Sequence, residues 1–170
     1  ENLYRYLFMR NQKIYEQYFT SGFERYKILK LLENDNRIKT NFIYRDKYRA
    51  GSKNETQRTT TTMEFYNNLR SSDYVICIRG TGNFSIRLYE TLMMGRIPIF
   101  INTDCILPYP DVIDWKKFVV WIEWDDRCEI QDRVIDFHNN ISNEDFVNMQ
   151  KSNRELWLSK LQPKWILKNL

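Results

Sequence analysis

The feature that most constrains the fold is a regular alternation of short apolar runs with segments that have helical patterns. Two of the runs are DYVICI (Asp73–Ile78) and IPIFIN (Ile97–Asn102). Both are nearly continuous in apolar, strand-forming residues, as expected for strands that are buried on both faces of a sheet. Because strands that alternate with helices form parallel sheets, this order predicts an α/β domain.

The same alternation continues on both sides of this pair. Right-handed crossovers then place helices on both faces of a Rossmann-like, mainly parallel sheet. A Thr61–Glu64 pair and a Ser142–Asp145 pair resemble capping boxes that begin helices. Further strands are expected at Arg5–Phe8 (RYLF), Ile38–Tyr44 and Phe118–Trp124, and helices at Gly22–Asn34, Thr62–Ser72, from Ser85 to about Met94 before Gly95, and Glu144–Leu161.

Length and composition bound the class of protein. The 170 residues suit one domain, here expected over residues 1–170 with a helical segment at 141–170. A net charge of +4 suits a phosphate site but is low for a nucleic-acid-binding protein, so no nucleic-acid partner is expected. The single histidine, His138, argues against a catalytic triad or a multi-histidine metal site. The three cysteines include no CxxC pair, which indicates free thiols in a reducing compartment. No apolar run approaches the roughly 20 residues of a membrane span.

The segment RGTGNFSIRLYE (Arg79–Glu90) follows the first of the buried strands. Ligands of open α/β sheets bind at the carboxyl ends of the strands, where helix N-termini favour anions. Gly80 and Gly82 allow a sharp turn and a close approach to a ligand. Arg79 and Arg87 carry forked donors that suit phosphate oxygens. The segment therefore predicts an anion site.

Three ligand classes compete for this site. A P-loop is excluded because GxxxxGK[ST] is absent. A dinucleotide site has a partial match, with Ser85 in the third glycine position and Asp104 after the next strand, although the loop lies mid-chain and few strands follow it. A nucleotide-sugar is favoured by Glu90, which lies over one turn along the expected helix, where it can accept hydrogen bonds from both ribose hydroxyls.

A further hypothesis, from a different functional class, is a non-catalytic module that binds glycan or nucleic acid. Its support is the basic loop Arg45–Arg58 together with the chain's aromatic residues. That loop is otherwise expected to be solvated, or to close over a bound donor.

Three segments resemble the exostosin family of glycosyltransferases. They are SDYVICIRGTGNFSIRLYETLMMGRIPIFI (Ser72–Ile101), LPYPDVIDWKKFVVWIE (Leu107–Glu123) and MQKSNRELW (Met149–Trp157). The match covers about Ser72 to Trp157. Within the family the chain looks most similar to exostosin-like enzymes of bacteria and large algal viruses, including viral xylosyltransferases.

The resemblance implies the donor-binding, C-terminal half of a GT-B enzyme, in which two Rossmann-like domains face a cleft. The implied reaction transfers a sugar, with inversion, from a UDP-sugar such as UDP-xylose to a glycan hydroxyl. An N-terminal domain of the same protein would hold the acceptor. The residues implied to bind the nucleotide-sugar are Arg79, Gly80, Thr81, Gly82, Asn83, Phe84, Ser85, Arg87 and Glu90.

Catalysis in such a half depends on stabilising the leaving diphosphate. No DxD motif is present, so no metal or prosthetic group is expected, and Arg79 and Arg87 are predicted to stabilise the leaving group instead. The general base is expected in the acceptor half, with Asp111 and Asp114 as candidates for an acid that faces the sugar.

Three glycosylation sequons begin at Asn54, Asn83 and Asn140. A glycan on Asn83 would obstruct the predicted site, which favours a cytoplasmic location, in the host cytoplasm if the protein is viral.

Overall fold

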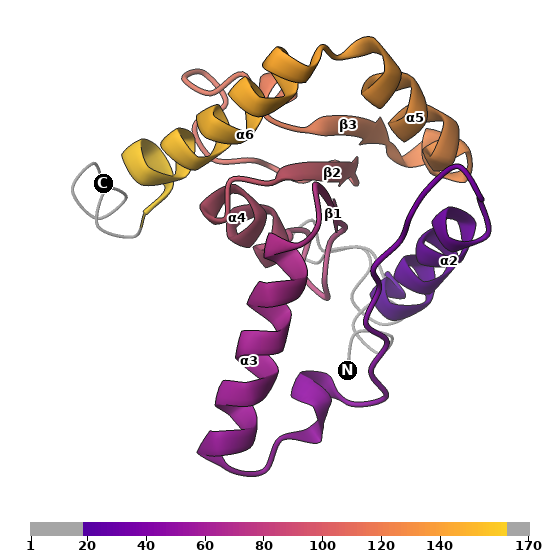
Figure 1. The fold of residues 1–170 in the computed structure, drawn as a ribbon, viewed down its shortest axis with the longest axis vertical. Coiled ribbons are helices and arrows are strands. Elements are labelled where there is room, and N and C mark those ends of the chain that lie inside the picture. The colour runs from indigo at the N-terminus through magenta and orange to yellow at the C-terminus, as the bar shows by residue number, and fades with distance from the viewer. Residues whose placement is uncertain (1–18, 163–170) are drawn as a thin grey trace, which may run out of the picture.

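The computed structural model describes residues 19–162, and they form a three-stranded parallel sheet covered by helices (Figure 1). The strands are β1 (Tyr74–Cys77), β2 (Ile97–Asn102) and β3 (Val120–Glu123), in the order β1-β2-β3. Ile99 in β2 lies between Ile76 in β1 and Val120 in β3. All three strands were predicted from their apolar runs, whereas the predicted strand Arg5–Phe8 lies outside the described residues.

The helices alternate with the strands as expected, and His138 lies in a helix. A π-helical turn at Trp157–Leu161 extends the last helix, and short 3-10 turns lie at Tyr48–Gly51, Trp115–Lys117 and Trp124–Glu129. None of the described helices is both long and apolar enough to cross a membrane. The main helices are α2 (Ser21–Glu33), α3 (Glu55–Arg70), α4 (Ile86–Met93), α5 (Ile130–Asn140) and α6 (Asn143–Leu156).

Helices cover both faces of the sheet, which confirms the predicted α/β, Rossmann-like arrangement. Residues of α4, α6 and the end of α3 form one core with Val75 and Cys77 of β1. Residues of α2 and α5 form a second core with Ile99 and Ile122 on the other face. The helical members of the first core are Leu69, Leu88, Leu92 and Leu156, and those of the second are Ile28, Leu32, Ile130 and Val134.

The helix termini agree with the sequence prediction at one capping box and disagree at the other. Ser142 caps α6, where its hydroxyl accepts a hydrogen bond from the backbone N–H of Asp145 at 3.0 Å. The predicted capping box at Thr61 is wrong because α3 begins earlier, where Asn54 accepts a hydrogen bond from the N–H of Gln57 at 2.9 Å. After α4, Gly95 has a φ of 62°, a left-handed conformation that suits a helix end.

The predicted strand at Ile38–Tyr44 is also wrong for the described residues, because this segment pairs with no strand. It is an extended connection that hydrogen bonds hold beside the end of α3. The Asn41 amide donates to the Ser71 hydroxyl at 3.1 Å, and the Asn68 amide donates to the Asn41 carbonyl at 2.7 Å.

Candidate functional site

The glycine loop closes on itself at the carboxyl end of β1. The N–H of Gly80 donates to the carbonyl of Phe84 at 3.0 Å, and the N–H of Phe84 donates to the carbonyl of Gly82 at 2.9 Å. Neither glycine has a left-handed φ, so the loop does not need glycine for its backbone conformation. A side chain at Gly80 would meet nothing within 4 Å, so the backbone here is open to a ligand.

Two other residues of the loop, Ser85 and Asn83, lie at the start of α4 and against the loop after β2. Ser85 is buried at the N-cap position of α4, but its hydroxyl makes no capping hydrogen bond. Asn83 binds the loop after β2, where its amide donates to the Thr103 carbonyl at 2.9 Å and its carbonyl accepts from the Thr103 hydroxyl at 2.8 Å. Asn83 therefore joins two loops at the sheet edge. Thr81 and Phe84 are exposed on the same loop.

Arg79 is buried at this edge, with only 7% of its surface exposed. Its guanidinium lies 4.7 Å from the centre of the Phe19 ring, and its Nη2 donates to the Thr81 carbonyl at 3.4 Å. The positive charge of Arg79 also lowers the pKa of Cys105, although burial outweighs it and leaves that pKa raised. Arg79 is thus fixed next to the glycine loop by an aromatic ring and a carbonyl.

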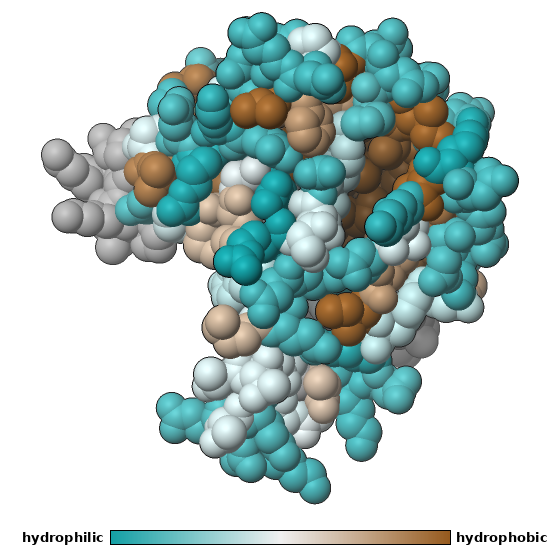
Figure 2. Space-filling view, in the orientation of Figure 1, coloured by the Kyte–Doolittle hydropathy of each residue, from teal (hydrophilic) through white to brown (hydrophobic). Residues whose placement is uncertain are grey.

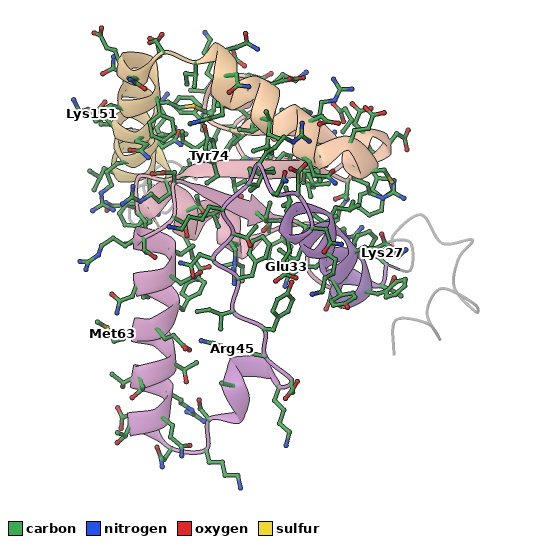
Figure 3. The ribbon with its side chains drawn as sticks, turned by 45° about the vertical axis from the view of Figure 1, so that its right-hand side comes forward. Lys27, Glu33, Arg45, Met63, Tyr74 and Lys151 are labelled. Carbon is green, nitrogen blue, oxygen red and sulfur yellow. The ribbon has the colours of Figure 1, made fainter. Side chains whose placement is uncertain are left out.

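A large groove, here called the basic groove, lies between α2, α3, α4, the edge of β1 and the Lys39–Lys47 connection. Its volume is about 1400 Å³, and Figure 2 shows it as a hollow with an apolar floor and hydrophilic walls. Figure 3 shows Arg45 on the connection between α2 and α3 and Tyr74 on β1. Arg87 and Glu90 from α4 both line the groove, together with Arg25 from α2, whereas Arg79 does not line it.

Arg25, Arg87 and Glu90 influence one another electrostatically. Burial lowers the pKa of Arg25, and the positive charge of Arg87 lowers it further. Burial raises the pKa of Glu90, and Arg87 opposes that shift. The Arg87 guanidinium is placed by the Phe65 ring of α3, 4.8 Å away. Two cations and one half-buried carboxylate thus line one groove, where an anion would offset the excess positive charge.

The basic loop supplies further positive charge to the same groove. Arg45 and Lys47 of this loop line it, as does Arg58, which the structure places in α3 rather than in the loop. Arg45 also forms an ion pair with Glu64 of α3. Asp46 is the one acidic residue among the lining residues of this loop. The loop therefore forms one wall of the basic groove and carries excess positive charge there.

The acidic candidates from the sequence lie elsewhere. Asp111 and Asp114 are exposed in the connection between β2 and β3, and Asp114 pairs with Lys117 at 3.4 Å. Asp104 is exposed after β2, and its N–H donates to the Asn102 side chain at 3.1 Å. None of the three lines the basic groove. Among the described residues, no three acidic, histidine or cysteine side chains gather as ligands for a metal.

Two polar residues near the sheet were not predicted as site residues from the sequence. One is Arg25, which lies three and seven residues before the buried Ile28 and Leu32. This helical spacing places Arg25 on the face of α2 that packs against the sheet. The other is Glu123 at the end of β3, whose carboxylate accepts hydrogen bonds from Asn102 and from the Trp121 indole, both at 2.7 Å. These two bonds hold the pKa of Glu123 below its usual range.

Comparison with known proteins identifies the family. The model of the Exostosin GT47 domain matches residues 6–134, which is most of the chain. The chain belongs to the exostosin GT47 family. β1, the glycine loop and α4 all lie inside the residues that match the GT47 domain.

Individual relatives of this GT47 chain come from plants and an insect. A probable glucuronosyltransferase, GUT1 of Oryza sativa subsp. japonica, is 32% identical over 36% of the chain and 15% of the relative. Exostosin-1 of Drosophila melanogaster is 28% identical over 61% of the chain and 13% of the relative. A probable beta-1,4-xylosyltransferase, IRX10 of Arabidopsis thaliana, is 30% identical over 39% of the chain and 16% of the relative. The chain thus matches about one seventh of the length of these relatives, and the expected closeness to viral and bacterial members stays a prediction.

Proposed function

We propose that this GT47 chain binds the nucleotide-sugar donor of a glycosyltransferase, with the diphosphate and ribose in the basic groove. The observation that carries the proposal is that Arg25, Arg87 and Glu90 line one groove. The glycine loop directly precedes α4 and its backbone is open at Gly80, although none of its residues lines the groove. A diphosphate would relieve the repulsion between the two arginines, and a carboxylate three residues along α4 from Arg87 suits the ribose hydroxyls.

In the proposed reaction an acceptor hydroxyl attacks the anomeric carbon of the sugar, and the bond from that carbon to the diphosphate breaks. Negative charge then grows on the departing diphosphate. Arg87 would stabilise this charge because the Phe65 ring already places its guanidinium before the reaction begins, and Arg25 would add positive charge from the same groove. Arg79 would add a fixed charge at the glycine loop. The reaction proceeds with inversion in this proposal and needs no metal.

The acceptor and the general base belong to the rest of the protein in this proposal. They would face the donor from an N-terminal domain of a GT-B enzyme, in the cytoplasm. The sugar is proposed to be a pentose or a uronic acid on UDP, because the relatives are named as probable xylosyl- and glucuronosyltransferases.

A panel of nucleotides tests the proposal with this chain. Thermal shift and calorimetry would be run with UDP, UDP-xylose, UDP-glucuronate and NAD, each with and without EDTA. UDP and one UDP-sugar should bind in EDTA, and Glu90→Gln should weaken UDP binding more than binding of inorganic diphosphate, which has no ribose.

The matched control is Glu155→Gln, an exposed glutamate of α6 that does not line the groove. If UDP or UDP-sugar binding strictly requires a metal ion, the proposal that the reaction needs no metal is wrong. NAD binding that depends on Asp104, without UDP binding, would instead support a dinucleotide site.

A further inference from the structure

Three buried polar atoms between α6 and the start of β2 have no hydrogen-bond partner among the described residues. They are Nε of Arg96, Nε2 of Gln150 and Oδ1 of Asn153. Asn153 is wholly buried, with 0% of its surface exposed. Buried polar atoms without a partner are rare in native proteins, because they lose their hydrogen bonds to water and regain none. These three atoms therefore call for a partner that the side chains and backbone around them do not supply.

The three side chains meet at one contact between α6 and the turn that follows α4. The Asn153 amide donates to the Arg96 carbonyl at 2.9 Å. Gln150 lies three residues before Asn153, on the same face of α6. The backbone of α6 also packs closely on Gly95, because a Cβ added there would lie 3.2 Å from the Gln150 carbonyl oxygen. The two side-chain amides of α6 thus lie against Gly95 and Arg96.

Neighbouring groups decide which atoms remain unpaired at this contact. The Nη2 of Arg96 donates to the Arg70 carbonyl at 2.6 Å, and its Nη1 lies 3.8 Å from the Asp73 carboxylate. The guanidinium is therefore held from its outer end, which leaves Nε. Asn153 must turn its Nδ2 toward the Arg96 carbonyl, which only accepts, and this leaves Oδ1. Neither side chain can turn away without breaking another hydrogen bond.

We propose that these three atoms bind one buried water molecule as a permanent part of the fold. A buried water makes about three hydrogen bonds to polar groups that otherwise lack partners. Here the water accepts from Nε of Arg96 and Nε2 of Gln150, and it donates to Oδ1 of Asn153. If the Gln150 amide is turned the other way, the water donates to its Oε1 instead. The site therefore fits both orientations of that amide.

The mixture of donors and an acceptor selects water over an ion. An anion would accept from Arg96 and Gln150 but would be repelled by the side-chain carbonyl oxygen of Asn153. A cation would be attracted by that oxygen but repelled by the guanidinium of Arg96. None of these three residues is among the described residues that line the basic groove. The water site is therefore separate from the proposed donor site and does not depend on the ligand of the groove.

The water completes a polar contact that fixes α6 against the end of α4. The direct part of this contact is the Asn153 hydrogen bond, together with one from Nη1 of Arg154 to the carbonyl of Met93, the last residue of α4. All the groups that α6 contributes belong to Met149–Trp157, one of the segments that resemble exostosins. This segment thus has a structural role at the end of the helix whose other residues line the basic groove.

A crystal structure of the unmodified chain, at a resolution that shows ordered waters, tests the site directly. One water should lie within about 3.2 Å of all three atoms. A direct hydrogen bond between the Gln150 and Asn153 side chains, with no water between them and Arg96, would overturn the proposal. A protein side chain in the position of the water would overturn it as well.

The stability of Gln150→Met gives a second measurement, and its sign decides. Methionine has a similar length and helix propensity but no amide. If the Gln150 amide binds the water, its removal breaks a hydrogen bond, and the melting temperature should fall by about 2–4 °C. If that amide is buried without a partner, methionine relieves the cost of burying it. An unchanged or raised melting temperature would therefore overturn the proposal.

The matched control is Lys151→Met, which places the same residue at the neighbouring, exposed position of α6 (Figure 3). Its melting temperature should stay close to that of the unmodified chain. An equal fall in both variants would contradict the proposal, because the loss of stability would then not come from the buried amide.

Discussion

Replacement of Arg87 by glutamine should weaken nucleotide binding without weakening the fold. Arg87 lies in the first turn of α4, with its side chain exposed to the basic groove and its guanidinium over the Phe65 ring. A hydrogen bond to a charged group contributes about 1.5–3 kcal/mol. The affinity for UDP should therefore fall by roughly 10- to 150-fold.

The stability of the free protein should respond differently. Arg87 lowers the pKa of Arg25, so its removal relieves a repulsion between two cations. It also opposes the raised pKa of Glu90, so its removal makes the neutral form of that carboxyl group more favoured. These effects have opposite consequences at neutral pH, and the melting temperature of the unliganded chain should change little.

Calorimetry with UDP and thermal melts without ligand measure the two quantities separately. The control is Arg133→Gln, which removes the same charge from the exposed face of α5, where Arg133 pairs with Asp126 and Glu129. If both variants bind UDP with the affinity of the unmodified chain, or if both lose it equally, Arg87 has no specific contact with the diphosphate.

Four further outcomes are expected. Because burial raises the pKa of Glu90, UDP affinity should fall on acidification at a higher pH than for an exposed glutamate, and Glu90→Gln should flatten this dependence in a pH series of titrations. The same raised pKa favours the neutral carboxyl group of Glu90 in the folded state. The unmodified chain should therefore lose stability relative to Glu90→Gln as the pH rises through the raised pKa of Glu90. A stability difference between the two chains that is equal at acid and neutral pH would contradict the buried position of Glu90. Burial raises the pKa of the Cys77 thiol to about 12, so a maleimide at pH 8 should modify the exposed Cys128 rapidly and leave Cys77 unmodified until the protein unfolds, as peptide mass spectrometry would show. Gly95→Ala should lower the melting temperature by about 2–8 °C, because an alanine in the left-handed conformation costs about 1–2 kcal/mol. The added Cβ would also lie 3.2 Å from the Gln150 carbonyl oxygen. An unchanged melting curve would contradict this prediction.

Much of the sheet could be predicted because its strands are buried on both faces. DYVICI, IPIFIN and the Phe118–Trp124 run each contain a long apolar stretch, which is a local signal that does not depend on the rest of the fold. The placement of Arg87 and Glu90 was equally local, since both lie on one short helix three residues apart.

The start of α3 could not be predicted from propensity. Residues 59–62 are four consecutive threonines, whose branched side chains disfavour helices. In the structure, the hydroxyls of Thr60 and Thr61 donate to backbone carbonyls four residues earlier, at 3.1 and 2.8 Å, and Asn54 caps the first turn. These contacts satisfy the hydroxyl groups inside the helix, so α3 extends through a stretch that was expected to be a loop.

Arg25 was missed because α2 has apolar residues on more than one side. The helical spacing of Phe23 and Tyr26 is that of a buried apolar face, yet these side chains are 58% and 50% exposed. The face that packs on the sheet contains Ile28 and Leu32, and Arg25 extends that face toward the carboxyl edge. Periodicity alone cannot choose between two apolar faces of a helix, because the choice depends on the strand that the helix covers.

The unpaired state of Ile38–Tyr44 has the same physical origin. The apolar alternation of a strand is written in its own sequence, but the hydrogen bonds that define it come from a neighbour. Ile38 and Phe42 already face the correct core, so the segment meets the local requirement. Residues of β1 line the same basic groove as this connection, but among the described residues β1 pairs with β2 alone. The expectation of a strand is therefore wrong within residues 19–162, because apolar alternation does not by itself supply the neighbouring strand that a ladder requires.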